Sequence, residues 1–329
     1  MLTLLSKVYC AVVARRNAGY DAQRRPIAHV SVPVISVGNI SVGGTGKTPV
    51  VQAVVRQLQT LGLHPAIVMR GYRRSSTGLL VVHDGTSTRA SVAEAGDEAY
   101  LHAVSLGVPV VVSKDKVEAA TYAATTMPCD VIVVDDGFQH RALHRDLDVV
   151  LVDRQTLTGS LLPSGRLREP LASLSRADVV LCMGDVDPVE VLPYKQSSAL
   201  ALSCAVEARS ARSIANESVE LDPGAEVVAV VGIARPERFL RTLEQLGYRV
   251  AEQVVFPDHH RYTNKDVDRL CSVAESRKAV LVTTEKDLVK LRPYMFVNGA
   301  QRVPMYVVSI HAILRDDAFS ALLKQRTTR

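Results

Sequence analysis

The strongest chemical signal in the chain is a glycine-rich loop, Gly43-Gly44-Thr45-Gly46-Lys47-Thr48, between a valine-rich segment and a predicted helix. Glycines let backbone N–H groups curl around phosphate oxygens, and the helix N-terminus adds its positive end. In such a loop the lysine reaches the β- and γ-phosphates of a nucleotide, and the threonine hydroxyl binds Mg²⁺. The loop therefore predicts a site for nucleotide phosphates.

One position of the loop departs from the usual spacing. The Gly-x-x-x-x-Gly-Lys-Thr pattern has a glycine at position 41, where this chain has Ser41. We expect Gly38 and the Gly43-Gly44 pair to supply the backbone freedom instead. An ordinary glycine-rich turn is the alternative, but the order of strand, loop and helix favours phosphate binding.

Two adjacent carboxylates follow a second apolar segment. Asp135 and Asp136 come directly after Val131-Ile132-Val133-Val134. A phosphate loop of this kind needs a carboxylate at the end of a neighbouring buried strand to hold its metal. Helix capping is the other interpretation of these aspartates. We predict that they bind Mg²⁺.

The elements that would position these residues alternate between strands and helices. Continuous apolar strands separated by helices are typical of a mainly parallel sheet covered on both faces. Strands are predicted at Val30–Val37, Ala66–Met69, Leu79–His83, Val108–Ser113, Val131–Asp135, Val149–Asp153 and Val179–Met183, with helices at Lys47–Leu61, Asp97–Leu106 and Lys114–Met127. We assign residues 26–197 to a P-loop NTPase-like α/β domain.

Polar, proline-containing sequence at 184–198 interrupts this alternation, and a second series follows. It predicts a smaller α/β domain at residues 198–329. Its elements are expected at Val227–Val231, Pro236–Leu246, Val250–Phe256, Lys265–Ser276, Ala279–Thr283, Met305–Ile310 and Asp316–Lys324.

The composition of the chain indicates which cellular compartment and which binding partners are expected. The five cysteines are scattered, without a Cys-x-x-Cys pair, which favours a reducing cytosol. Nucleic acid is not expected as a partner, because the chain has no Trp and no nucleic-acid-binding pattern. Basic residues crowd the first quarter of the chain and favour an anionic partner: Arg15, Arg16, Arg24, Arg25, Arg70, Arg73 and Arg74.

The first residues form a short apolar segment. Residues 1–14 contain only three polar side chains and are followed by Arg15 and Arg16. The segment is too short to span a bilayer, and its positive charge follows the apolar stretch instead of preceding it as in a secretory signal. Residues 1–25 are predicted to form a helix that lies in the membrane interface or, equally well, packs on the protein's own core.

Further segments complete the pattern of one family. With Asp135-Asp136-Gly137-Phe138-Gln139-His140 added to the loop, the sequence resembles the tetraacyldisaccharide 4'-kinase family of the lipid A pathway of Gram-negative bacteria. One departure is Ala99, where family members often have proline. The other matching segments follow in the family's order: Val37-Gly38-Asn39, Arg70-Gly71-Tyr72, Gly96-Asp97-Glu98, Leu167-Arg168-Glu169-Pro170, Phe256-Pro257-Asp258-His259-His260 and Thr284-Glu285-Lys286-Asp287.

The resemblance implies a kinase bound peripherally, as a monomer, to the cytoplasmic face of the bacterial inner membrane. Its smaller domain would close the active-site cleft. ATP with Mg²⁺ would phosphorylate the 4'-hydroxyl of tetraacyldisaccharide 1-phosphate, an acylated glucosamine disaccharide, for lipopolysaccharide synthesis. Anionic inner-membrane lipids would be the second partner.

The resemblance also implies a role for each site residue. Thr45, Lys47 and Thr48 would contact the nucleotide phosphates and the metal. Mg²⁺ would lie among Asp135, Asp136 and Glu169, and the transferring phosphoryl group near Gln139, Arg70 and Arg168. Asp97 and His259 would activate the sugar hydroxyl, with Asp97 in the phosphate-binding domain and His259 in the other.

Other interpretations of single residues remain open on pattern alone. Asp97 at a helix start is also a typical N-cap residue. His259 and His260 resemble zinc ligands, although no suitably spaced partner accompanies them. Lys286 follows the apolar run Val280–Val282 and is either a nucleotide contact or a solvated charge.

A membrane-associated ATPase switch is the alternative function. Such proteins have a deviant loop with an extra lysine just before the glycine pair, where this chain has Val42. A GTPase is disfavoured, because Thr284-Glu285-Lys286-Asp287 lacks the Asn-Lys-x-Asp spacing that recognises guanine.

Overall fold

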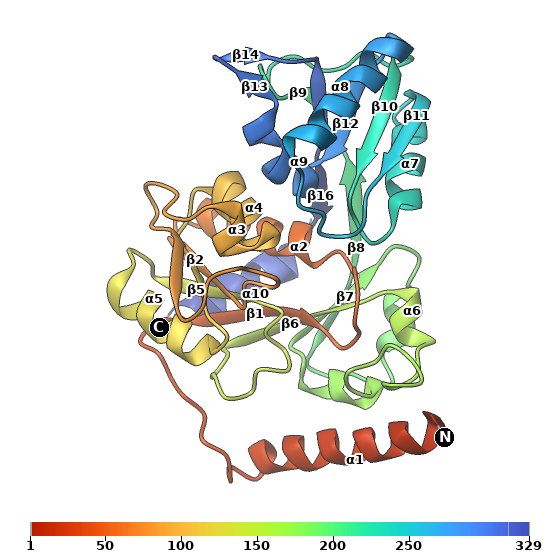
Figure 1. The fold of residues 1–329 in the computed structure, drawn as a ribbon. Helices are drawn as coiled ribbons and strands as arrows, with labels where there is room; N and C mark the ends of the chain where they lie inside the picture. Colours follow the sequence, from red (N-terminus) through yellow and green to blue (C-terminus); the bar gives the residue numbers. More distant parts are fainter. Residues whose placement is uncertain (1, 315, 329) are drawn as a thin grey trace. The chain divides into compact units, whose positions relative to one another are not determined.

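The computed structural model describes residues 2–314 and 316–328, which fall into two units (Figure 1). Unit 1 comprises Met1–Ala95, His102–Val206 and Ala312–Arg329, and unit 2 comprises Gly96–Leu101 and Glu207–His311. The sequence-based division differs from these units in four segments. Gly96–Leu101 belongs to unit 2, whereas residues 1–25, residues 198–206 and the C-terminal segment belong to unit 1.

Unit 1 contains the larger sheet. In the described residues its order is β16-β8-β7-β6-β1-β5-β2-β4-β3, parallel from β8 to β4 with β3 antiparallel at the edge. The strands are β1 (Val34–Asn39), β2 (Pro65–Met69), β3 (Leu80–His83), β4 (Val110–Val112), β5 (Val131–Asp135), β6 (Leu147–Val152), β7 (Val179–Met183), β8 (Leu200–Ala208) and β16 (Ile310–Ile313). All residues of β1, β2 and β4–β7 are buried, because helices cover the sheet. The predicted mainly parallel sheet is confirmed.

The helical segments of this part of the chain are α1 (Leu2–Asp21), α2 (Lys47–Thr60), α3 (Val92–Ala95), α4 (Asp97–Leu106), α5 (Lys116–Thr126), α6 (Arg154–Leu157), η1 (Leu171–Arg176), η2 (Pro188–Val191) and α10 (Asp317–Thr327). Helix α10 joins unit 1 through its own side chains. Phe319 and Leu323 are fully buried, Gln57 donates to Ser320 Oγ at 2.5 Å, and Arg326 donates to Asp178 at 3.1 Å. These contacts explain why the last helix is not part of the smaller unit.

Unit 2 is built on a smaller sheet. Among the described residues the strand order is β11-β10-β12-β15-β9, in which only β9 is antiparallel to its neighbour. The strands are β9 (Arg212–Ser213), β10 (Glu226–Val231), β11 (Arg249–Val255), β12 (Val280–Thr284) and β15 (Met305–Val308), with a ribbon of β13 (Phe296–Val297) and β14 (Ala300–Gln301). The helices are α7 (Pro236–Gln245), α8 (Asn264–Arg277), α9 (Glu285–Leu291) and η3 (Arg292–Tyr294). The predicted second α/β part is therefore present.

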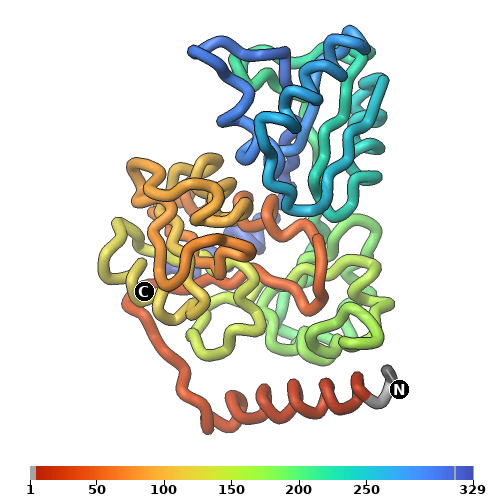
Figure 2. The backbone as a smooth tube through the Cα atoms, in the orientation of Figure 1, coloured from red at the N-terminus to blue at the C-terminus, as the bar shows by residue number. Residues whose placement is uncertain are grey.

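Helix α1 lies along unit 1, beside the segment that contains α6 and η1 (Figure 2). Ser6, Val13 and Asn17 are buried on this side, whereas Leu5, Val8 and Val12 are 47%, 56% and 62% exposed. None of the described helices combines the length and the hydropathy needed to cross a membrane. The helix thus packs on the protein with one face and leaves an apolar face outside.

Candidate active site

The glycine-rich loop connects β1 to α2, as predicted. Gly43 and Gly46 have φ angles of +109° and +84°, in the left-handed region that favours glycine. A Cβ atom at Gly43 would lie 2.1 Å from Arg166 Nη2, so the arginine side chain would have to move to admit it. Helix α2 begins at Lys47, and its first N–H groups and positive dipole end adjoin the loop. This geometry suits an anion at the loop.

Lys47 is held at the edge of the sheet where the parallel strands end. Its Nζ lies 3.3 Å from Asn39 Oδ1 and 3.4 Å from Asp136 Oδ1. Asn39 is the last residue of β1 and donates through Nδ2 to Thr45 Oγ1 at 2.8 Å. One amide side chain therefore ties both the lysine and the loop to the strand. The sequence patterns did not identify Asn39 as a site residue.

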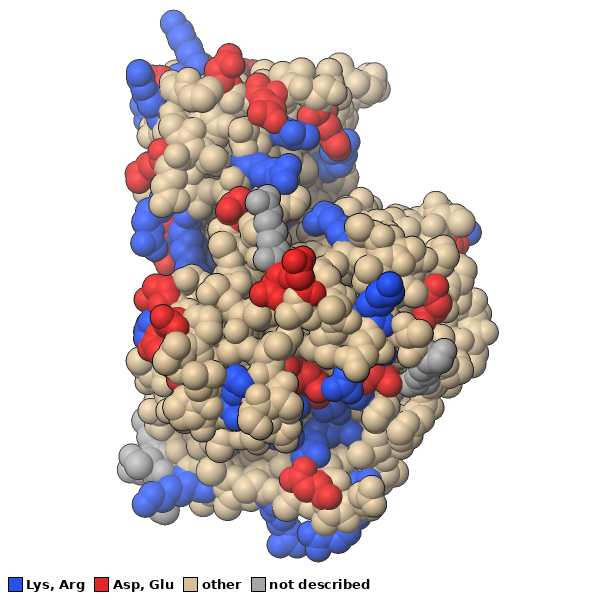
Figure 3. Space-filling view, turned by 180° about the vertical axis from the view of Figure 1, so that it is seen from behind, with Lys and Arg blue, Asp and Glu red and all other residues tan. Residues whose placement is uncertain are grey.

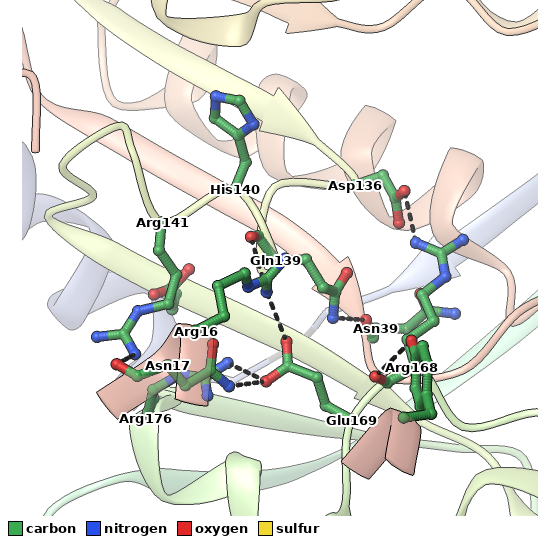
Figure 4. Close-up of polar contacts among 12 residues, drawn as sticks. Arg16, Asn17, Asn39, Asp136, Gln139, His140, Arg141, Arg168, Glu169 and Arg176 are labelled. Atoms are coloured by element: carbon green, nitrogen blue, oxygen red, sulfur yellow. Dashed lines mark hydrogen bonds and ion pairs between the residues drawn. The ribbon is translucent and has the colours of Figure 1, made fainter. Parts of the chain in front are cut away.

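Asp136 is surrounded by cations. Arg168 Nη1 donates to its Oδ2 at 2.8 Å (Figure 4), and Lys116 Nζ donates to its backbone carbonyl at 2.5 Å. Burial alone would raise the pKa of Asp136, but the charges of Lys47, Arg168 and Lys116 outweigh it and lower the pKa to about 2. The φ angle of Asp136 is +54°, a strained conformation of the kind that clusters at functional sites.

Lys116 is a second residue that the sequence patterns missed. It is buried at the start of α5, after the N-cap Asp115, and Nζ also donates to the backbone carbonyl of Asp135 at 2.8 Å. Burial lowers the pKa of this lysine, against the opposing charges of the two aspartates. Its only sequence signal was its place just after a buried strand of the same sheet.

Asp135 ends β5, and its side chain is buried. Val37 of β1 pairs with Asp135 in register, so the carboxylate lies at the same sheet edge as the loop. In the described part of the chain, Asp135 Oδ1 has no hydrogen-bond partner. The nearest base is His102, whose Nε2 is 3.7 Å from Asp135 Oδ2. A buried carboxylate oxygen without a donor is suited to a cation.

Glu169 is held differently from the two aspartates. It is fully buried, and its Oε2 accepts from Asn17 Nδ2 at 2.7 Å and from Arg176 Nη2 at 2.9 Å (Figure 4). Among the described residues, no three His, Cys, Asp or Glu side chains group as a metal site. The place of Glu169 beside Mg²⁺ stays a prediction.

The remaining predicted phosphate contacts lie around the same edge. Gln139 Nε2 donates to the Asn39 carbonyl at 2.9 Å, which fixes the side chain next to the end of β1. Arg70 is exposed and directly follows β2, the neighbour of β5 in the sheet. Thr48 lies in the first turn of α2. Unit 1 thus brings together the loop, Asp135, Asp136, Gln139 and Arg168.

Unit 2 carries a separate cluster around Asp97. His259 Nδ1 lies 3.1 Å from Asp97 Oδ2, and Lys290 Nζ lies 3.3 Å from the same oxygen. Burial would raise the pKa of Asp97, but the hydrogen bond with His259 and the charge of Lys290 together lower it. The φ angle of His259 is +62°, again a strained conformation for a residue with a side chain. Asp97 and His259 therefore pair within one unit and do not come from two.

Two lysines of α9 flank this pair. Lys286 Nζ is 3.4 Å from His259 Nε2 and 3.5 Å from Glu98 Oε1. Lys290, one helical turn further on, is buried and also lies 3.0 Å from Asp287 Oδ1. The sequence patterns singled out Lys286 as a nucleotide contact but missed Lys290, although residues four apart share a helix face.

We expect Lys290→Met to move the acid limb of the pH dependence of kcat/KM to higher pH. The ammonium group stabilises the ionised form of Asp97, so its loss raises the pKa of a base that must be unprotonated. Rates measured between pH 4 and 8 test this, with Lys265→Met, an exposed position on α8, as the control. If the acid limb of Lys290→Met stays at the wild-type pH, Lys290 does not set the pKa of the group responsible for that limb.

Fold and site together define a two-unit α/β protein with a phosphate-binding loop at the end of a parallel sheet and a paired carboxylate and imidazole in the second unit. The chain belongs to the LpxK family, tetraacyldisaccharide-1-P 4'-kinase, whose model matches residues 1–328. The family predicted from the sequence motifs is confirmed, and the alternative of a membrane ATPase switch has no support from it.

Individual relatives cover nearly the whole chain. The tetraacyldisaccharide 4'-kinase of Anaeromyxobacter sp. (strain Fw109-5) is 42% identical over 309 residues, 89% of this chain and 82% of the relative. That of Anaeromyxobacter dehalogenans (strain 2CP-C) is 39% identical over 337 residues, 98% of this chain and 89% of the relative. A crystal structure of LpxK from Aquifex aeolicus in complex with ATP has a TM-score of 0.78 at 30% identity and covers 99% of this chain and 98% of its own.

Proposed function

We propose that this protein transfers the γ-phosphate of ATP to the 4'-hydroxyl of tetraacyldisaccharide 1-phosphate in lipid A biosynthesis. Family membership and the ATP in the Aquifex structure support the reaction class and the donor. The observation that carries the proposal here is Lys47, fixed by Asn39 and Asp136 directly after a loop shaped for phosphate. We propose that this loop acts as a P-loop, with Thr45, Lys47 and Thr48 on the phosphates.

The deciding experiment is a phosphoryl-transfer assay. The protein is incubated with labelled ATP, Mg²⁺ and the disaccharide lipid in detergent micelles, and the lipid fraction is analysed for label. We expect a phosphorylated lipid. Hydrolysis of ATP without labelled lipid would instead support a nucleotide-dependent switch.

The residues at the sheet edge fit Mg²⁺. The ion commonly binds through one or two carboxylates and substrate phosphates while keeping several waters. Asp135 and Asp136, with the Thr48 hydroxyl, would hold it, and the unpartnered Asp135 Oδ1 is the available ligand atom. When bound, the ion neutralises charge on the phosphates. Glu169 accepts two hydrogen bonds at Oε2, whereas its buried Oε1 has no hydrogen-bond partner among the described residues, and we propose that it lies near the ion as the third carboxylate of this site.

Asp135→Asn should raise the Mg²⁺ concentration needed for half-maximal activity and should recover partly at high Mg²⁺. The amide keeps the shape of the side chain but loses the charge that attracts the ion. Activity is titrated with Mg²⁺ at saturating ATP, with Asp115→Asn at the exposed N-cap of α5 as the control. An unchanged Mg²⁺ dependence in Asp135→Asn contradicts the metal site.

We propose that the two units serve one reaction. Unit 1 would bind the nucleotide, and Asp97 of unit 2 would take the proton of the attacking hydroxyl while His259 orients it. Arg70, Gln139 and Arg168 would contact the transferring phosphoryl group, and Lys286, 3.4 Å from His259 Nε2, would contact the nucleotide.

We further propose that α1 docks on anionic lipids at the cytoplasmic face of the inner membrane. Leu5, Val8 and Val12 are spaced by three and four residues and are about half exposed or more, so they form one apolar stripe. Arg15, Arg24 and Arg25 are exposed at the end of the helix and beyond it. The end of the face in Figure 3 that corresponds to α1 in Figure 1 carries several basic side chains.

Reversal of Arg15 and Arg24 to Glu should weaken binding to anionic vesicles tenfold or more, with less effect as salt rises. Each basic residue near such a surface contributes on the order of 1 kcal/mol, and salt screens that attraction. Vesicle sedimentation measures it, with Arg241→Glu and Arg269→Glu, two exposed positions of unit 2, as the control. Arg16 is left out, because it donates to the Gln139 carbonyl at 3.3 Å. If vesicle binding is unchanged by these substitutions, the proposed docking of α1 on the membrane is wrong.

A further inference from the structure

Helix α1 directs Ser6, Tyr9 and Asn17 inward beside the buried Val13, and leaves Leu5, Val8 and Val12 outside. Ser6 Oγ donates to the Leu161 carbonyl at 3.1 Å, and Tyr9 and Asn17 lie on the same face further along the helix. A helix that served only as an anchor needs no buried polar groups, since each costs free energy unless it is paired. The inward face therefore has a use beyond attachment.

Two of these side chains hold one short segment. Tyr9 Oη donates to the backbone carbonyl of Arg168 at 3.0 Å, and Asn17 Nδ2 donates to Glu169 Oε2 at 2.7 Å (Figure 4). Tyr9 and Asn17 are eight residues apart, about two turns of an α-helix, which places both donors on one side. Consecutive residues of the segment are thus fixed from the same helix.

The other side of this segment lies against the phosphate site. The N–H of Arg168 donates to the Ile40 carbonyl at 2.7 Å, and the N–H of Val42 donates to the Arg166 carbonyl at 2.8 Å. The guanidinium of Arg168 then reaches Asp136 Oδ2 at 2.8 Å. Segment 166–169 is held between α1 and the start of the glycine-rich loop, so a shift at α1 moves Arg168.

A second contact leads from α1 to the same site. Arg16 Nη2 donates to the Gln139 carbonyl at 3.3 Å and lies 3.9 Å from Glu169 Oε1. Gln139 is three residues after Asp136 and is bonded to the end of β1. Helix α1 therefore supports both chain segments that flank Asp136.

Because the charge of Glu169 is buried, its contact with Asn17 tolerates little change in the charge at position 17. Glu169 is fully buried and Asn17 is nearly so, and Arg176 is the partner that offsets the charge at 2.9 Å. A second carboxylate at position 17 would face Glu169 at hydrogen-bond distance, where like charges in a desolvated site repel strongly.

We propose that Asn17 of α1 is a positioning residue for the kinase reaction, which holds Glu169 and thereby the Arg168 guanidinium on Asp136. The inference rests on the proposed function. It means that the helix with the apolar outer stripe also completes the support of the phosphate site. Asn17 itself touches none of the reacting atoms.

The test uses the full chain in detergent micelles at saturating lipid, so that vesicle attachment does not limit the rate. Asn17→Asp is expected to lower kcat tenfold or more, with less than a threefold change in the KM for the lipid. Asn17→Asp combined with Glu169→Gln restores one carboxylate and one amide across the contact, and kcat is expected to return to within threefold of wild type. Thermal unfolding is followed for each variant.

Ala14→Ser, at another exposed position of α1, is the matched control. It should leave kcat in micelles unchanged. If Asn17→Asp does not fold, Asn17→Ala, which removes the amide that donates to Glu169 without adding a charge, is decisive by the same comparison with a kcat loss of threefold or more.

The proposal is overturned if Asn17→Asp, or Asn17→Ala where it is needed, keeps wild-type kcat. It is equally overturned if the exchanged pair folds as stably as wild type without regaining activity. Failure of the proposed function would look different, because wild-type protein would then yield no phosphorylated lipid.

Discussion

Lys47→Ala is expected to lower kcat for lipid phosphorylation by about 10²- to 10³-fold, as when a preorganised donor to developing charge is removed. The ammonium group is fixed by Asn39 and lies next to the loop whose glycines and helix N-terminus shape an anion site. In the proposed role its charge would stabilise the phosphoryl group in transfer more than it stabilises the fold. Asp136 keeps Arg168 as a partner in the variant. Steady-state kinetics with labelled ATP, beside thermal unfolding, measure both effects.

Two further substitutions sharpen this result. Lys47→Arg keeps the charge but changes its shape and reach, so it should remain well below wild type. Lys114→Ala removes an exposed lysine just after β4 and should leave kcat unchanged. Wild-type turnover in Lys47→Ala would reject the assignment of the loop.

The strands that sequence predicted best are those buried on both faces. Strand β5 was predicted with its observed bounds, because a continuous β-branched run leaves little alternative. Strand β8 was missed, since its residues are mostly half-buried or exposed and it follows the polar stretch that suggested a domain boundary. The short α9 was missed as well, because seven residues give too little periodicity.

The residues of the candidate site also divide into those that the sequence patterns revealed and those that they did not. The glycine-rich loop and the Asp135-Asp136 pair are contiguous in sequence, so their pattern alone revealed them. Asn17 reaches Glu169 across 152 residues, and no local pattern encodes such a contact. Asn39 and Lys116 lie at strand and helix ends whose meeting depends on strand order. The sequence patterns did not determine which polar residues outside the motifs the fold brings into contact with them.

Helix α1 shows the limit of a hydrophobicity pattern. The pattern left membrane docking and core packing as equal alternatives, and the structure packs one face while the other stays exposed. The apolar residues Leu5, Val8 and Val12 face outward, and apart from the buried Val13 the inward contacts include the hydrogen bonds of Ser6, Tyr9 and Asn17. A prediction that places every apolar residue in the core would have packed the exposed apolar face of this helix against the protein.

Asp97→Ala and His259→Ala are each expected to lower kcat by about 10²-fold or more, since a positioned base contributes roughly 10²- to 10⁴-fold to proton transfer. A hydroxyl is a weak nucleophile, and Asp97 is held ionised by His259 and Lys290. The two side chains share one hydrogen bond, so the double variant should be little slower than the slower single variant. The KM for ATP should stay near wild type in all three, because the proposed role of both residues is at the attacking hydroxyl and not at the nucleotide.

Asp97→Asn separates charge from shape in this pair. The amide can still hydrogen-bond His259 but cannot accept the proton, so kcat should fall nearly as far as in Asp97→Ala. His260→Ala is the matched control for His259, because His260 bonds Asp266 at 3.2 Å and lies outside the pair. Losses that multiply in the double variant would show that Asp97 and His259 act independently. A rise in the KM for ATP alone would instead place Asp97 at the nucleotide and leave the attacking hydroxyl without its base.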